Sequence, residues 1–358
     1  MPEYRNQHYV PQFYLSRFSN DGDRINLYNT QARQEFNEPI SRVCSRSYFY
    51  SDNTDIERAI GQIEGSLAEG LNEIIDAEAV SEFQVREELK PNWLQVMQFL
   101  TFQEARTALS REELERDSDF FFEEFVRAGV EAGELEPEHL EGVQAGEITL
   151  EWDQSPQLSS MLYQIHCAPL LADLYGTIFI NETSSKFVTS DHPVVRHNPY
   201  YADEGYTQLA GWQARGLQIY CPLTSEHYLL LHDPECYDVE SHPDGSLVID
   251  DEDMVEDLNR LQLVHCEDNV FYGESGRQAE MQELHDELEP LVDQDRSSRG
   301  AFESQNGRGI YTHISVPEFV PDLPFVSESS GVEFTPERVE GSRREQERIW
   351  EEQFGDVI

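Results

Sequence analysis

The sequence contains very few lysines and few basic residues of any kind. Of 358 residues, 25 are Lys or Arg and 71 are Asp or Glu, which leaves a formal net charge of −46. Lys90 and Lys186 are the only lysines. Proteins that bind nucleic acid through a broad basic face depend on Lys and Arg to displace counterions from phosphates. The shortage of basic residues therefore argues against such a face, and against docking on an anionic membrane surface.

Paired cysteines and long apolar runs are also missing. The five cysteines are an odd number and none stands in a Cys-x-x-Cys pair, so the sequence predicts neither a disulfide framework nor a structural zinc site. No stretch approaches the roughly 18 apolar residues that a transmembrane helix needs. The first residues lack the apolar segment of a secretory signal. We therefore expect a cytoplasmic protein that does not enter the membrane.

Negative charge is abundant and spread over the whole length. Charged residues make up 27% of the chain, close to the roughly 25% of ordinary globular proteins, so the anomaly lies in the sign of the charge. In molar salt the Debye length falls to about 3 Å, which screens carboxylate repulsion and lets halophilic proteins carry such a charge. An acidic disordered chain is the alternative, but 16 Tyr and 19 Phe are too many for one. We interpret the chain as a folded halophilic protein.

Apolar spacing predicts helices in the first half. Six apolar residues from Ile56 to Ile74 recur at intervals of three and four, which marks one face of a helix. A helix that opens at Pro91 is apolar nearly all round and should lie in the core. An acidic stretch is interpreted as a helical insertion at about 110–155. A further buried helix is expected over Met161–Tyr175.

The second half favours strands. Short runs rich in β-branched and aromatic residues, separated by turn residues, occur at 176–180, 186–189, 217–220 and 227–231, with one or two more expected within 261–272. This order predicts an α+β fold, with a helix-rich N-terminal half packed on a mostly antiparallel sheet from the second half. We expect a single domain over 1–320 and a charged C-terminal tail over 321–358 that contains a helix.

Two short strings are the most distinctive part of the sequence. The first is His-x-x-Pro-x-x-x-Leu, formed by His8, Pro11 and Leu15, and the second is Phe187–Val194 with its Thr-Ser-Asp-His-Pro core. Together they resemble the DUF4238 family of uncharacterised proteins. Further matching segments are Ile63-Glu64, Gln103-x-x-Arg106-Thr107 and Tyr220-Cys221-Pro222-Leu223-Thr224.

The resemblance extends from His8 to about Tyr272, with the acidic insertion weakly covered. The chain departs from the family at His192, where the family more often has Asn. The family brings no established activity, fold or cofactor, so any mechanism has to be argued from the residues themselves.

Polar residues in these strings could form an active site. His8 can act as a general base, and Arg106 can hold a phosphate through two hydrogen bonds. Glu64, Asp191 and His192 form a carboxylate-imidazole set that could bind a divalent metal ion. With Gln12, Gln103 and His192 as binding residues, the set would suit a metal-dependent phosphodiesterase or nuclease, which is a hydrolase of a phosphate-containing substrate.

The alternative is a non-catalytic binding or assembly module in which the same residues hold the fold together. Arg106 would then pair with Glu64 between two packed helices, and Asp191 would cap a turn by accepting backbone N–H groups. An open cleft that brings His8, Arg106 and Asp191 within about 8 Å would favour the enzyme. Residues sealed inside the fold and bonded to one another would favour the binding module.

Overall fold

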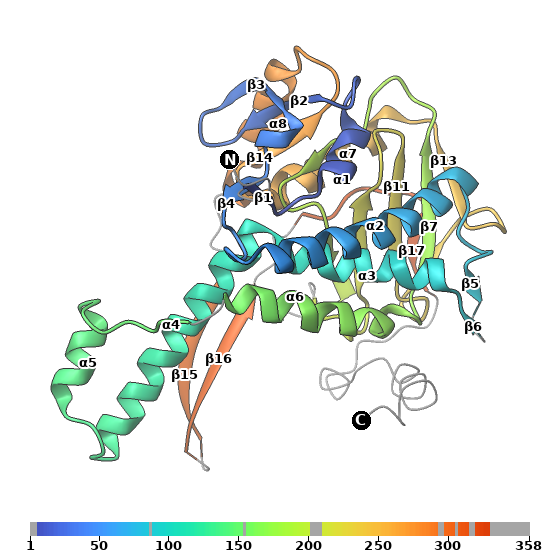
Figure 1. Ribbon diagram of the computed structural model, residues 1–358. Coiled ribbons are helices and arrows are strands. Elements are labelled where there is room, and N and C mark those ends of the chain that lie inside the picture. Colours follow the sequence, from blue (N-terminus) through green and yellow to red (C-terminus); the bar gives the residue numbers. More distant parts are fainter. Residues whose placement is uncertain are drawn as a thin grey trace.

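The computed structural model describes residues 6–85, 88–152, 155–200, 210–292, 297–304, 307–314 and 319–329. Within these ranges the chain forms eight α-helices and 17 strands, with most helices in the first half and most of the sheet in the second (Figure 1). The predicted α+β class is therefore confirmed. Across the described ranges, no helix is both long and apolar enough to cross a membrane.

Three helices form one layer of the fold. They are α2 (Thr54–Ala77), α3 (Pro91–Arg106) and α6 (Pro156–Cys167). Helix α3 packs against both of the others and lies between them (Figure 1). The buried positions of α2 follow the predicted spacing, and α3 is buried as predicted. Gly70 lets α2 approach α3, because a Cβ at Gly70 would lie 2.6 Å from the Cβ of Gln95.

A five-stranded sheet forms the second layer. Its strand order is β13-β7-β11-β10-β9, and β13 alone pairs in parallel within it. One face of the sheet packs on the helical layer, and the other packs on α7 (Glu252–His265). The strands are β7 (Tyr175–Asn181), β9 (Val195–His197), β10 (Gln218–Pro222), β11 (His227–His232) and β13 (Ser246–Ile249).

A four-stranded antiparallel sheet, in the order β3-β2-β14-β8, holds the N-terminal region against the second half. Helix α8 (Gln278–Val292) packs on α7 and shares a buried apolar cluster with this sheet. Because β8 pairs with β14, the residue that follows β8, Asp191, lies next to the loop between α7 and β14. The strands are β2 (Arg24–Asn29), β3 (Gln34–Pro39), β8 (Thr189–Ser190) and β14 (Asn269–Tyr272).

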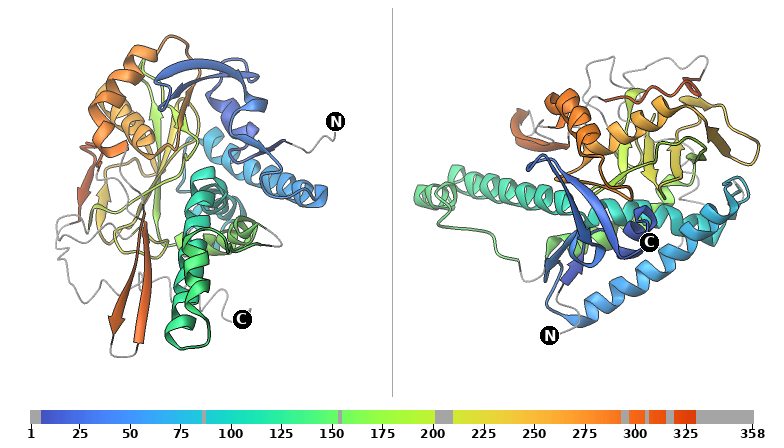
Figure 2. Two further views of the ribbon diagram at one scale, coloured as in Figure 1. Left: turned by 90° about the vertical axis from the view of Figure 1, so that its left-hand side faces the viewer. Right: turned by 90° about the horizontal axis from the view of Figure 1, so that it is seen from above.

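An arm projects from this body. It consists of α4 (Ala108–Glu131), α5 (Pro137–Gln144) and a hairpin of β15 (Ser297–Ser304) and β16 (Gly307–Ile314) that runs beside α4 (Figures 1 and 2). Ion pairs fasten the hairpin to the helix: Arg299 contacts Glu113 at 2.7 Å and Asp117 at 2.6 Å, and Arg308 contacts Glu124 at 2.7 Å.

Short elements complete the fold. Leu323 and Phe325 are buried, next to the strand pair β12-β17. The boundary at residue 320 stays a prediction, and the helix expected in the tail lies outside the described residues. The short elements are α1 (Gln12–Leu15), β1 (Asn6–His8), which pairs with β4 (Ser45–Ser47), β5 (Gln84–Val85), β6 (Glu88–Leu89), β12 (Tyr237–Val239) and β17 (Val326–Glu328).

Two local predictions need correction. One or two strands were expected within 261–272, and one is present, but Leu261–His265 ends α7, whose N-cap residue Asp251 accepts a hydrogen bond from the N–H of Asp253. Only Asn269–Tyr272 of the expected region is a strand. The second correction concerns the buried helix expected over Met161–Tyr175. Tyr175 begins β7, and the helix itself, α6, ends at Cys167. It packs on α3 on one side, while Leu162 and Tyr163 on its other side are 51% and 67% exposed.

Candidate functional site

Arg106 is the centre of a polar cluster between β1, α2 and α3. Its side chain is 1% exposed, and Nη2 lies 2.7 Å from Glu64 Oε1. The same nitrogen donates to the backbone carbonyl of His8, and Nε donates to the Tyr50 hydroxyl at 3.2 Å. Burial by itself lowers the pKa of Arg106, but Tyr50 and Glu64 outweigh it and raise the pKa. Arg106 therefore stays charged and joins three segments of the fold.

His8 lies at the edge of this cluster. Its Nδ1 is 3.5 Å from Gln12 Nε2. Its Nε2 is buried and has no hydrogen-bond partner of good geometry in the described part of the chain. Burial lowers the pKa of His8 and outweighs the opposite effect of Glu64. Backbone groups of Ser41 and Ile40 also interact with the ring and oppose the lowering of the pKa. Because the pKa is lowered overall, the imidazole is neutral at pH 7.

Gln103 supports the same strand from α3. Its Nε2 donates to the backbone carbonyl of Tyr9 at 3.0 Å, and the side chain is fully buried. Gln103 thus positions β1, whereas Gln12 is exposed at the surface. Of the three expected binding residues, Gln12 is exposed to a ligand and Gln103 is not; His192 is described below.

Asp191 is engaged elsewhere. It is 1% exposed, and its carboxylate accepts the backbone N–H groups of Glu267, Asp268 and Asn269 at 2.7–3.0 Å, together with the Asn269 amide. Burial raises the pKa of Asp191 to about 6, although these hydrogen bonds oppose the rise. The carboxylate holds the loop between α7 and β14, as the structural alternative predicted.

His192 contacts the residue that follows Arg106. Its Nδ1 lies 2.9 Å from the hydroxyl of Thr107, which caps the start of α4 by accepting the N–H of Ser110. His192 thus connects the Asp191 loop to the junction of α3 and α4. This contact positions the chain and leaves its Nδ1 unavailable to a metal ion.

The structure therefore separates the predicted site. His8, Glu64, Arg106 and Gln12 lie together, but no hydrogen bond or ion pair of Asp191 reaches them. Searched over the described residues, the chain holds no group of three or more His, Cys, Asp or Glu side chains that could bind a metal ion. Glu64, Asp191 and His192 do not converge, because each is held by a different partner.

Two residues of these clusters, Tyr50 and Glu267, were not singled out as site residues from the sequence. Tyr50 contacts Arg106, and Glu267 lies beside Asp191 with its carboxylate 3.6 Å from Arg46. Burial and the charge of Asp191 raise the pKa of Glu267 to about 8. Both residues stand in unremarkable sequence, and only the folded chain brings them to Arg106 and Asp191.

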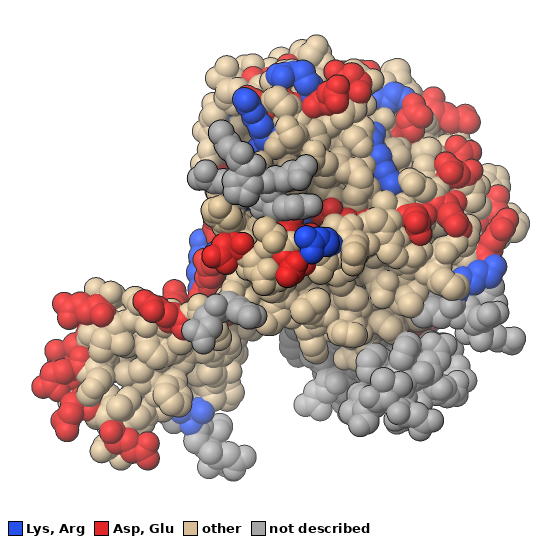
Figure 3. Space-filling model, in the orientation of Figure 1, with Lys and Arg blue, Asp and Glu red and all other residues tan. Residues whose placement is uncertain are grey.

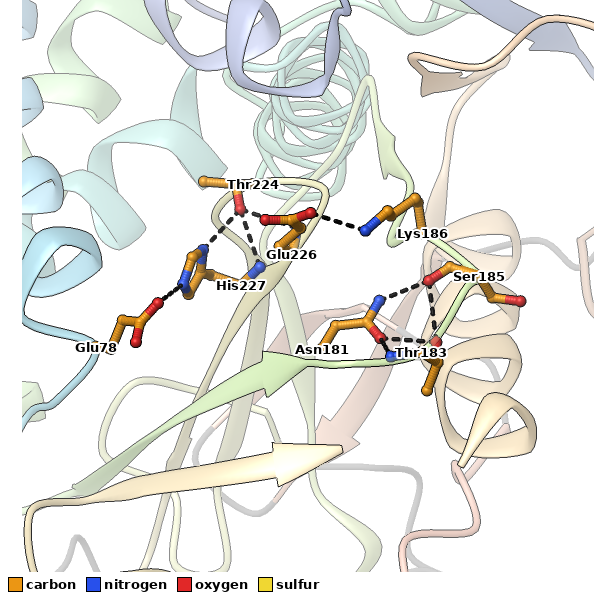
Figure 4. Close-up of polar contacts among 8 residues, drawn as sticks. All are labelled: Glu78, Asn181, Thr183, Ser185, Lys186, Thr224, Glu226 and His227. Carbon is orange, nitrogen blue, oxygen red and sulfur yellow. Dashed lines mark hydrogen bonds and ion pairs between the residues drawn. The ribbon is translucent and has the colours of Figure 1, made fainter. Parts of the chain in front are cut away.

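A second polar network joins the end of α2 to the turn between β10 and β11 (Figure 4). His227 contacts the Thr224 hydroxyl at 3.0 Å through Nδ1 and Glu78 at 3.3 Å through Nε2. Glu226 of the same turn pairs with Lys186 at 2.8 Å. Because both ring nitrogens of His227 are engaged and the hydroxyl also accepts backbone N–H groups, the network has a positioning role.

Two hollows lie between α2 and α6. One, of about 350 Å³, is lined mainly by Tyr50, residues 51–53, Trp152 and Ser155. The other, of about 250 Å³, is lined by residues of α2 and α6 with Gln98 of α3 below. Neither hollow is lined by His8, Glu64, Arg106 or Asp191. These two hollows are therefore not built from the residues expected to be catalytic.

The model of the family described as "Protein of unknown function (DUF4238)" matches residues 6–276. This range agrees with the resemblance read from the two strings near His8 and Asp191. No curated protein and no solved structure matches the chain. Because the matched range covers most of the chain, the protein belongs to the DUF4238 family.

Proposed function

We propose that the protein is a non-catalytic binding or assembly module. The observation that carries the proposal is the state of the residues expected to be catalytic. Arg106 and Asp191 are each 1% exposed, Arg106 is bonded to Glu64 and to β1, and Asp191 is bonded to a backbone loop. Buried groups that are bonded to one another stabilise a fold. Nη1 of Arg106 is buried without a hydrogen-bond partner among the described residues, but a side chain that is 1% exposed cannot contact a substrate unless the fold opens.

A hydrolase acting on a phosphate-containing substrate is the second candidate, and His8 favours it. Burial lowers the pKa of His8, and a neutral imidazole has the protonation state that a general base needs. Gln12 and the partly exposed Glu64 lie beside it. Such an enzyme would take its substrate at this local site and would need no broad basic face.

Turnover distinguishes the two candidates. We expect no hydrolysis of p-nitrophenyl phosphate or bis(p-nitrophenyl) phosphate in molar KCl with Mg²⁺ or Mn²⁺, for the wild type or for His8→Ala. Hydrolysis by the wild type that is lost in His8→Ala, but kept when the exposed His139 is replaced by Ala, would contradict the binding module and support the hydrolase.

We also propose that the protein works in a salt-rich cytoplasm. The support is the net charge of −46 with only two lysines, because carboxylate repulsion on this scale needs screening. The five cysteines are free and buried, which suits a reducing compartment.

A further inference from the structure

Helix α6 lies in a segment without charge. Residues 155–172 contain no Asp, Glu, Lys or Arg. At the chain's average of 27% charged residues, a segment of this length would carry about five. A buried segment would explain the absence, but Leu162 and Tyr163 are 51% and 67% exposed, and Ser159 and His166 are exposed as well. The outer side of α6 is therefore a neutral, partly apolar surface on a strongly acidic protein.

The neutral surface continues into the seam between α6 and α2. The floor of the seam is α3, and the hollow of about 250 Å³ within it is lined by Ile63, Ser66, Leu67, Gln98, Leu162, Ile165 and His166. None of these residues is acidic, Lys or Arg. Figure 3 shows a largely uncharged band where α3 and α6 lie in Figure 1. Acidic residues are frequent on the surface above this band and on the arm.

The lack of charge on this surface indicates which kind of partner covers it. A basic partner would be drawn to carboxylates, which are plentiful elsewhere on the chain and missing here. Two strongly negative proteins repel each other, so they can meet closely only where neither presents carboxylates. A second copy of this chain, with the same net charge of −46, is the partner that such a surface fits.

The shape of the surface fits a second copy too. Leu162 and Tyr163 protrude from α6 directly beside the hollow that Leu162 helps to line. In a two-fold dimer the same patch on each protomer faces its copy. The protruding side chains of one protomer therefore meet the hollow of the other, and the reverse holds as well. We propose that the α6 face, defined by Ser159, Leu162, Tyr163 and His166 with the adjoining hollow, is the interface of a homodimer.

This inference rests on the proposed function, since it names the partner of an assembly module. Sedimentation equilibrium of the full chain in 2 M KCl tests it. The wild type should be a dimer, and Ser159→Glu and Tyr163→Glu should each raise the dimer dissociation constant at least tenfold, because each places two carboxylates across the two-fold axis. Both residues are exposed, so the variants should keep the wild-type circular dichroism spectrum.

Phe125→Glu is the matched control, because Phe125 is 73% exposed on α4, away from this face; it should leave the dimer unchanged. Dimerisation should also tighten between 0.3 and 2 M KCl as repulsion is screened. A monomeric wild type, or a dimer that both α6 variants leave intact, would overturn the interface while leaving another partner open to the binding module. Turnover that depends on His8 would overturn the proposed function and leave the dimer standing.

Discussion

Arg106 Nη2 lies 2.7 Å from Glu64 Oε1 and joins α3 to α2, while the same guanidinium donates to the carbonyl of His8 in β1. Arg106 is almost fully buried and Glu64 is 25% exposed. The pair therefore holds together three segments that are far apart in the sequence. Its loss should lower the free energy of unfolding.

Arg106→Leu should lower the free energy of unfolding by about 3 kcal/mol. The substitution leaves the Glu64 carboxylate without its ion-pair partner and removes one donor each from the His8 carbonyl and the Tyr50 hydroxyl. Glu64→Gln should cost about 1 kcal/mol, since water reaches its carboxylate. Urea unfolding measures both. The control is Arg58→Leu, which removes an exposed pair with Asp55 and should change stability by less than about 0.5 kcal/mol. Equal effects for Arg106 and Arg58 would contradict the role of Arg106.

Asp191→Asn should lower the free energy of unfolding by about 2–3 kcal/mol, because the new amide N–H₂ would face backbone N–H donors that now meet a carboxylate oxygen. Asp250→Asn, at an exposed position, should be neutral within about 0.5 kcal/mol. Chemical denaturation of the two variants side by side checks this. A fully stable Asp191→Asn protein would mean that the carboxylate is not a structural anchor.

Glu267 predicts a pH dependence of stability. Because its pKa is raised from 4.5 to about 8, the folded state holds this proton more tightly than the unfolded state. Stability from Glu267 is therefore full below about pH 4.5 and is lost as the pH rises toward 8. Asp191, with a pKa of about 6, contributes in the same direction only up to about pH 6.

Between pH 6 and pH 9 the wild type should thus lose on the order of 2 kcal/mol that Glu267→Gln does not lose. The variant should be the more stable of the two at pH 9. Urea unfolding at four or five pH values gives both profiles. Parallel profiles would show that the carboxyl of Glu267 ionises normally.

Salt should stabilise the folded protein strongly at pH 7. The net charge of −46 is screened only when the Debye length becomes short, about 3 Å at 1 M. The thermal unfolding midpoint should therefore rise between 0.1 and 2 M KCl. Near pH 4.3, where the sequence has no net charge, the rise should be much smaller. A midpoint that responds equally to salt at both pH values would contradict charge repulsion as its cause.

Local patterns in the sequence predict the parts of the fold that depend on neighbours along the chain. The three-and-four spacing from Ile56 to Ile74 defined α2, and the apolar character of the segment after Pro91 placed α3 in the core. The same reasoning failed at Leu261–His265, where apolar residues suit a strand and a helix equally well and the Asp251 cap decides for the helix.

The candidate site depended on long-range contacts, which one sequence does not reveal. Glu64 and Arg106 could be paired in advance because both lie on helices that were expected to pack. Asp191 could be expected to accept backbone N–H groups, but its partners lie 76–78 residues away. The burial of α6 was misjudged for a related reason. A helix without charged residues is expected to be buried within its own chain, but the same composition also suits a helix that a second molecule covers.

If the protein is a non-catalytic binding module, the polar residues near His8 and Asp191 maintain the fold and bind no ion or nucleotide. The most direct test is thermal unfolding in molar KCl with a panel of divalent ions and nucleotides, for the wild type and Asp191→Ala. A ligand that binds the folded state raises its stability by mass action. We expect no shift with any ligand and a lower unfolding midpoint for Asp191→Ala in every condition. Stabilisation of the wild type by one ion or nucleotide that disappears in Asp191→Ala would contradict a purely structural role for these residues.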